Sequence, residues 1–134
     1  MSRTRIILRL ATLGVIAALG AGQASLARPL TPQEEARVQP TGKPVNCLQL
    51  SRINESRVRD DSTIDFMMNN GEVYRNRLPN SCPQLGYEER FSHETSIQEI
   101  CSSDIITVLT GGPGLMRGAS CGLGQFQPVS GVPR

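Results

Sequence analysis

The chain has 134 residues, of which four are cysteines, and it contains three phenylalanines, two tyrosines and no tryptophan. That length allows one small domain with a thin apolar core, in which covalent cross-links contribute much of the stability. The chain has 14 basic and 12 acidic side chains, and after residue 27 the two signs are interleaved, as in "RINESRVRDDSTID", which argues against a nucleic-acid-binding surface.

Residues 1–27 are typical of a secretory signal peptide. Three arginines precede the apolar run 10–21, and the small residues Ser25 and Ala27 fit the site that signal peptidase cleaves. Twelve apolar residues fall short of the ~20 that span a bilayer, so we expect no membrane span in the mature chain. Cleavage after Ala27 leaves 11 basic against 12 acidic side chains, and export places residues 28–134 in the periplasm or the medium.

Residues 28–45 are expected to form a poorly ordered tail. Thr31, Pro32 and Glu34 fit the N-cap and the first and third positions of a helix of one or two turns. No sustained apolar face follows, and two prolines and a glycine end the helical pattern. The sequence therefore predicts a single β domain over residues 46–134.

A hairpin is predicted in the stretch "STIDFMMNNGEVYRNRL", with its turn at residues 69–71. A three-residue turn with a left-handed glycine sets Phe66 opposite Tyr74. It also sets Asp65 opposite Arg75, whereas a two-residue turn sets Phe66 opposite Arg75. Aromatic and opposite-charge pairs stabilise a hairpin, so we expect the three-residue turn.

Before this hairpin, residues 47–60 carry two strand signals, and the alternating charges of residues 52–65 indicate a solvated strand surface. After it, prolines and a glycine predict a loop over residues 78–89. A short strand follows around "RFSHE". Ser96 and Glu99 have capping-box spacing, which predicts about one helical turn before Asp104.

The end of the chain contains the most apolar stretch of the mature protein. Residues 104–110 are rich in β-branched side chains and are expected to form the central strand. A flexible hairpin loop is expected over 111–118. The last strand, "ASCGLGQFQPV", carries Gly122 and Gly124, which indicate a bend or a close backbone approach.

The four cysteines are expected to form two disulfides, because an even number in an exported chain is typical of cross-linking. No C-x-x-C pair is present, so a redox motif and a zinc knuckle both lack their spacing, and we expect no metal and no cofactor. One short strand separates Cys82 from Cys101, and the first and last strands meet if the sheet closes. These arguments predict the pairs Cys82–Cys101 and Cys47–Cys121.

His93 is the single histidine and the first candidate for catalysis. A small envelope hydrolase or inhibitor-like module could use it with Glu94 or Asp104, although surface acids are the more common role for such residues. We assign no catalytic residue. The favoured function is non-enzymatic binding of a protein or another envelope component, for which Met67-Met68 or Leu115-Met116 could form an exposed apolar patch.

Three segments together carry a resemblance: "YRNRLPNSCPQL", "ICSSDIITV" and "SCGLGQFQPV". Over residues 46–130 the chain resembles an uncharacterised family of small secreted bacterial proteins, classed as a domain of unknown function. The resemblance implies an exported four-cysteine domain and brings no activity or ligand. Together with the strand pattern, we expect an all-β fold: a strongly bent barrel or sandwich of five or six strands, with one short helical turn.

Overall fold

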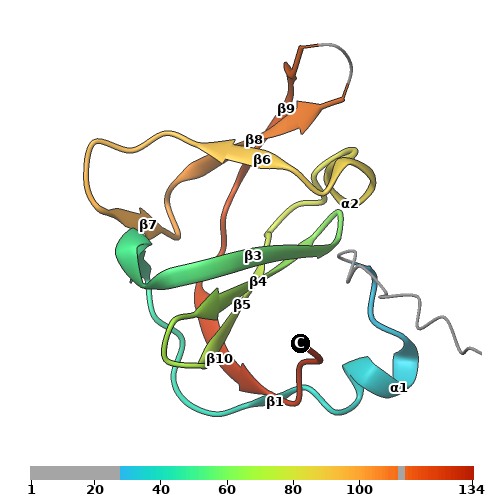
Figure 1. The fold of residues 1–134 in the computed structure, drawn as a ribbon, viewed down its shortest axis with the longest axis vertical. Helices are drawn as coiled ribbons and strands as arrows, with labels where there is room; N and C mark the ends of the chain where they lie inside the picture. The colour runs from blue at the N-terminus through green and yellow to red at the C-terminus, as the bar shows by residue number, and fades with distance from the viewer. Residues whose placement is uncertain (1–27, 112–113) are drawn as a thin grey trace, which may run out of the picture.

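The computed structural model describes residues 28–111 and 114–134, and strands dominate this part of the chain. Ten short strands form three antiparallel sheets in a sandwich-like arrangement (Figure 1), which confirms the all-β class. The described residues form no closed barrel. None of their helices has the length and apolar character required to cross a membrane. The predicted signal peptide and residues 112–113 of the predicted 111–118 loop lie outside the described residues, and the loop is shorter than predicted because β9 begins at Met116.

The largest sheet has five strands in the order β1-β10-β5-β4-β3. These strands are β1 (Gln39–Pro40), β10 (Phe126–Ser130), β5 (Val73–Arg77), β4 (Thr63–Met68) and β3 (Ile53–Asp60). Every residue of β4 is buried, because the main core covers one face of the strand and a second apolar cluster, with the arginines around Asp65, covers the other.

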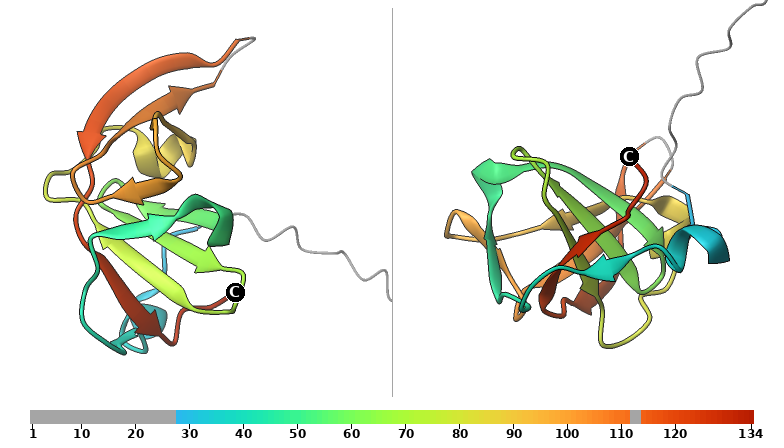
Figure 2. Two further views of the ribbon diagram at one scale, coloured as in Figure 1. Left: turned by 90° about the vertical axis from the view of Figure 1, so that its left-hand side faces the viewer. Right: turned by 90° about the horizontal axis from the view of Figure 1, so that it is seen from below.

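The two smaller sheets complete the sandwich. One pairs β2 (Cys47–Gln49) with β7 (Glu99–Cys101). The other has the order β6-β8-β9, with β6 (Phe91–His93), β8 (Ile105–Thr110) and β9 (Met116–Gly122). The predicted central strand is thus the middle strand of this sheet, and the β8–β9 hairpin extends away from the rest of the molecule (Figure 2).

The main core lies between the five-stranded sheet and the two smaller sheets. Phe66 of β4 and Phe126 of β10 pack edge to face with ring centroids 5.4 Å apart. Apolar residues of every sheet surround them: Leu48, Val58, Ile64, Met68, Leu78, Leu85, Ile100, Ile106, Val108 and Leu123. A second, smaller cluster on the other face of the five-stranded sheet is formed by Met67, Val73 and Val129 with Val38 and Val132.

The predicted hairpin register is confirmed. Phe66 lies opposite Tyr74, and Asp65 lies opposite Arg75. The N–H of Gly71 donates to the carbonyl of Met68 at 3.0 Å, and Gly71 has a φ of 89°. Glycine adopts this left-handed backbone conformation more readily than residues that carry a β-carbon, which explains the glycine at position 71.

Two local predictions were wrong. Residues 95–101 form no helical turn; residues 99–101 form β7, because pairing with β2 satisfies their backbone groups and buries Ile100 in the core. The predicted loop over residues 78–89 contains a helical turn, α2 (Leu85–Glu88), whose Leu85 is completely buried. In both segments the burial of one apolar side chain, Ile100 or Leu85, favours a local structure other than the one that the sequence pattern predicts.

The segment 28–45 is part of the folded unit, so the prediction of a poorly ordered tail is wrong. It begins with α1 (Pro32–Glu35), which has the predicted capping box: Thr31 and Glu34 exchange side-chain to backbone hydrogen bonds. β1 then pairs with β10, and Val45 forms a bridge with Phe126. The sequence signal failed because the segment is fixed by long-range pairing and by ion pairs, not by an apolar face of its own.

The prediction of a solvated surface over residues 52–65 is wrong for two of its charged side chains. Asp65 is completely buried, and Arg59 is 5% exposed. The Arg59 Nε donates to Asp65 Oδ2 at 2.8 Å, and the Arg75 Nε donates to Asp65 Oδ1 at 2.7 Å. Arg59 and Asp65 therefore belong to a buried ion-pair network, whereas Arg52, Glu55 and Asp60 are exposed as predicted.

All four cysteines form disulfides, but the predicted pairing is wrong. The bonds are Cys47–Cys101 and Cys82–Cys121. The prediction assumed that the first and last strands meet in a closed sheet. Instead β2 pairs with β7, which places Cys47 directly opposite Cys101. Cys82 is buried in the main core, where Cys121 of β9 reaches it.

The predicted last strand is divided into β9 and β10, and the chain crosses from one sheet to another between them. At this crossing the Asn76 side chain donates to the carbonyl of Gly124 at 2.7 Å and accepts from its N–H at 2.9 Å. A β-carbon on Gly124 would collide with the carbonyl oxygen of Arg77. The predicted close backbone approach is therefore confirmed at Gly124.

We expect Gly124→Ala to lower the free energy of unfolding by about 1–3 kcal/mol, because the added methyl group forces two backbone segments apart. Gly122→Ala is the matched control: its β-carbon meets no atom within 4 Å, so we expect a change below about 0.5 kcal/mol. Urea unfolding of both variants measures the difference. Equal losses would contradict the close approach.

Candidate functional site

A groove of about 330 Å³ opens beside β2. One wall is formed by β2 and the following 3₁₀ turn η1 (Leu50–Arg52), and the other by the turn end of the β4–β5 hairpin. Its lining mixes apolar and polar side chains: Val45, Cys47, Leu48, Gln49, Arg52, Met68, Asn69, Asn70, Glu72 and Tyr74. The volume lies at the lower end of the range of small-ligand pockets.

Among residues 28–111 and 114–134, no strand pairs with the edge of β2 that faces this groove. Hydrogen bonds to the β7 side are made by residues 46, 48 and 50: Ser102 N–H donates to the Asn46 carbonyl and Leu50 N–H to the Gln98 carbonyl. Hydrogen-bonded and non-hydrogen-bonded pairs alternate in an antiparallel ladder. The N–H and C=O groups of Cys47 and Gln49 therefore point away from β7, and no residue of β7 lines the groove.

The groove has two closed ends. At one end Val45 exchanges two backbone hydrogen bonds of 2.9 Å with Phe126 of β10. At the other end Asn69 N–H donates to the Arg52 carbonyl at 2.9 Å, and the Asn69 side chain donates to the Ser51 carbonyl. Between Val45 and Arg52 the chain pairs with β7 instead of the five-stranded sheet, and the groove opens between this stretch and the β4–β5 hairpin.

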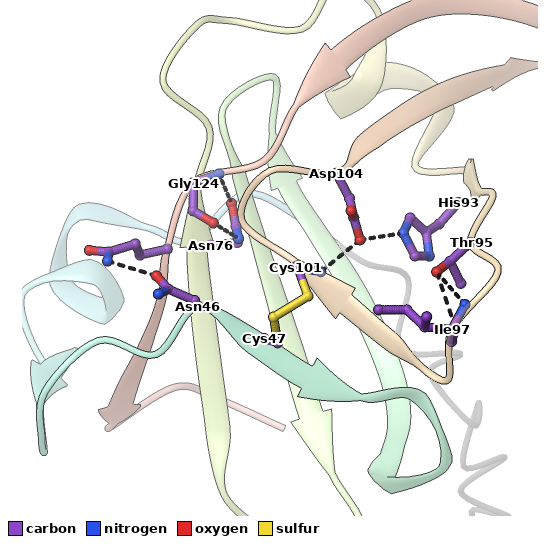
Figure 3. The surroundings of a disulfide bond; sticks show 10 residues. Asn46, Cys47, Asn76, His93, Thr95, Ile97, Cys101, Asp104 and Gly124 are labelled. Atoms are coloured by element: carbon purple, nitrogen blue, oxygen red, sulfur yellow. Dashed lines mark hydrogen bonds and ion pairs between the residues drawn. A yellow bond between two sulfur atoms is a disulfide. The ribbon is translucent and has the colours of Figure 1, made fainter.

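The Cys47–Cys101 disulfide holds the groove wall in place (Figure 3). It joins directly opposite residues of β2 and β7, with 4.0 Å between their Cα atoms. Beside it, the Gln125 side chain donates to Asn46 Oδ1 at 3.0 Å, which ties the start of β2 to the crossing segment. The edge strand is thus cross-linked on the side opposite the groove.

His93 and Asp104, two of the residues predicted as catalytic candidates, are brought together. The His93 Nε2 lies 2.8 Å from Asp104 Oδ2, and the same oxygen accepts from Cys101 N–H at 2.8 Å (Figure 3). The Cys101 N–H and, to a lesser degree, the His93 ring lower the pKa of Asp104 below its ordinary value, against the opposing effect of burial. Glu94 instead pairs with Arg117.

The geometry around His93 supports a structural role. Its side chain is 8% exposed, and it does not line the groove beside β2. Within residues 28–111 and 114–134, its hydrogen-bond partner is Asp104, with no Ser, Thr or Cys side chain in hydrogen-bond contact. The pair closes the turn after β7 and supports the Cys101 end of the disulfide.

In the part of the chain that the structure describes, one cluster has the composition of a metal site: Cys47, Glu99 and Cys101 have ligand atoms within 4.8 Å of one another. Both sulfur atoms are in the disulfide, however, and a metal ligand must be a thiolate. One carboxylate remains, which is too few ligands for a metal site of this kind.

The two apolar patches suggested by the sequence have different outcomes. Met67 and Met68 are each 8% exposed and belong to the two cores. Leu115 and Met116 are exposed at the end of the β8–β9 hairpin, beside residues that lie outside the described part. The sequence did not predict the β2 groove, because its defining feature is the backbone of an edge strand, which no residue type marks.

No family model, curated protein or solved structure matches the chain. Three geometric features distinguish the groove: an open strand edge, a lining of mixed polarity and a disulfide that fixes the wall.

We expect Asp104→Ala to lower the free energy of unfolding by about 1–3 kcal/mol at pH 7, because Cys101 N–H and His93 lose their acceptor. The lowered pKa of Asp104 means that its contribution is present above the unfolded pKa of about 3.9 and is lost as the pH falls through the lower folded value. Chemical unfolding at pH 7 and at stepwise lower pH measures this.

Glu94→Ala is the control, since the exposed pair with Arg117 contributes less than about 1 kcal/mol. A pH-independent difference between Asp104→Ala and the wild type would show that the charge of Asp104 is not what stabilises the turn.

Proposed function

We propose that the chain is an exported binding module that captures an extended peptide segment as an added strand on the groove side of β2. The observation that carries the proposal is the unpaired edge of β2 inside a groove of about 330 Å³. An extended peptide that pairs with a free strand edge gains main-chain hydrogen bonds, and pockets for alternate side chains give it specificity.

The groove lining indicates what kind of peptide fits. Alternate side chains of an added strand would contact the apolar floor near Leu48, Met68 and Tyr74. The intervening side chains would point the other way, where Cys47 and Gln49 are exposed. A segment with apolar residues at every second position therefore matches the site better than a uniformly polar one.

Export is part of the same proposal. Two disulfides are typical of proteins that fold in an oxidising compartment such as the periplasm or the medium. The disulfide Cys47–Cys101 supports the groove wall, so the proposed activity depends on that compartment.

The second candidate, a hydrolase or inhibitor-like module that uses His93, is favoured by the His93–Asp104 pair alone. Hydrolysis by such a pair requires a nucleophile or a water positioned against the second ring nitrogen. Because Asp104 also accepts from Cys101 N–H, support of β7 already accounts for the pair. We therefore place binding first.

The test removes one N–H group from the edge of β2. Gln49 has a φ of −74°, which proline adopts without strain, so Gln49→Pro deletes the groove-side donor while the fold is retained. Gln49→Ala is the control, because it changes the side chain and keeps the donor. The probes are heptapeptides selected from a displayed random library on the wild-type chain.

We expect peptides with alternating apolar residues to be selected, to bind Gln49→Ala about as tightly as wild type, and to bind Gln49→Pro about tenfold more weakly. Tenfold corresponds to about 1.4 kcal/mol, the upper range for one hydrogen bond. Fluorescence anisotropy measures the affinities. Failure to select any peptide, or equal binding to both variants, would overturn the proposal.

A further inference from the structure

The outer face of the five-stranded sheet carries a second cavity, of about 290 Å³. Arg75 and Arg77 of β5 and Gln127 of β10 line it from the sheet, and Glu35 of α1 lines it from the N-terminal segment. Successive side chains of a strand point to opposite faces, so this cavity lies on the face of β5 opposite the Tyr74 side chain that lines the groove.

A carboxylate is already bound in this cavity, and it belongs to the chain itself. The Nη1 of Arg75 donates to both Glu35 oxygens, at 2.7 and 2.8 Å, and the Nη2 of Arg77 donates to Oε1 at 2.7 Å. Charge-assisted contacts from guanidinium groups are among the strongest hydrogen bonds in proteins. Burial alone raises the pKa of Glu35, but the hydrogen bonds from Arg77 and Arg75 outweigh it and hold the pKa below its ordinary value.

The buried charges of the sheet beside Glu35 explain why a carboxylate is required in this cavity. Arg75 is 2% exposed, and the buried carboxylate of Asp65 serves both Arg75 and Arg59. Asp65 thus balances one of two buried positive charges, and the exposed Arg77 adds a third. Since unbalanced buried charge is costly, the site retains its demand for an anion when Glu35 is absent.

The helix that supplies Glu35 is itself exposed, although the chain after it is held on the sheet by β1 and by Val38. α1 has four residues, and none of them is buried. The following strand, β1, pairs with β10 through two residues only. The Glu35 side chain is 42% exposed, so solvent and solutes reach the carboxylate. The Glu35 side chain is thus a ligand tethered to its own binding site. A competing molecule needs one carboxylate to take its place on Arg75 and Arg77.

We propose that the cavity is a binding site for a glutamate or aspartate side chain of an acidic peptide, with Glu35 as its internal competitor. The incoming carboxylate takes the place of Glu35 on Arg75 and Arg77, and the apolar side chains of Val38 and Val129 contact its neighbouring atoms. This site is separate from the β2 groove, and its test is independent of that proposal.

The probe is N-acetyl-glutamate amide, which carries one side-chain carboxylate, and N-acetyl-glutamine amide is its uncharged match. The full chain is compared with Glu35→Ala and with Glu34→Ala, because Glu34 lies in the same helix and pairs with Arg28 instead of the sheet. NMR shifts of the Nε–H groups of Arg75 and Arg77 follow the titration.

We expect Glu35→Ala to bind the glutamate probe at least twofold more tightly than the wild type and Glu34→Ala, because it lacks a tethered competitor whose effective concentration is in the millimolar range. The glutamine probe should produce no shift, and adding Arg77→Ala to Glu35→Ala should weaken binding severalfold. If Glu35→Ala does not fold, saturation of the wild type with the glutamate probe should still shift the α1 amides. Equal affinity in the three chains, or no α1 shift in the wild type, would overturn the proposal.

Discussion

The ion pairs around Asp65 determine how the five-stranded sheet is assembled. A fully buried carboxylate is stable only when charged partners replace its lost hydration, and Asp65 obtains them from Arg59 of β3 and Arg75 of β5. Three adjacent strands are thereby fixed by one side chain. Arg75 in turn needs a second carboxylate, and Glu35 supplies it. This ion pair attaches α1, which buries no residue, while β1 pairing and Val38 attach the chain that follows it.

The groove follows from the path that the chain takes after that segment. Val45 pairs with β10, residues 46–50 pair with β7, and Arg52 contacts the β4–β5 turn, so the backbone changes partners twice within eight residues. A strand that leaves one sheet for another leaves a free edge where the first sheet would have continued. The Cys47–Cys101 bond keeps β2 with β7 and prevents it from closing that gap. The open edge is therefore built into the covalent structure.

Features encoded by neighbouring residues were predictable from the sequence. The capping box at Thr31, the left-handed Gly71 and the close approach at Gly124 all depend on short-range chemistry or on the absence of a side chain. The disulfide pairing was not predictable, because it depends on which distant strands are neighbours. The burial of Arg59 and Asp65 was hidden for the same reason: alternating charges are equally compatible with a surface and with a covered face until the covering segment is known.

The candidate sites show the same difference between short-range and long-range features, and β5 separates the two cavities. Residue types drew attention to His93 and Asp104, whereas the β2 edge and the Glu35 cavity are relations between distant segments. Tyr74 faces the groove and Arg75 faces the cavity, so adjacent residues of one strand serve opposite faces of the sheet. β5 is hydrogen-bonded to β4 on one side and to β10 on the other. Because a strand paired on both edges resists displacement, we expect a ligand on one face to leave the geometry of the other face unchanged.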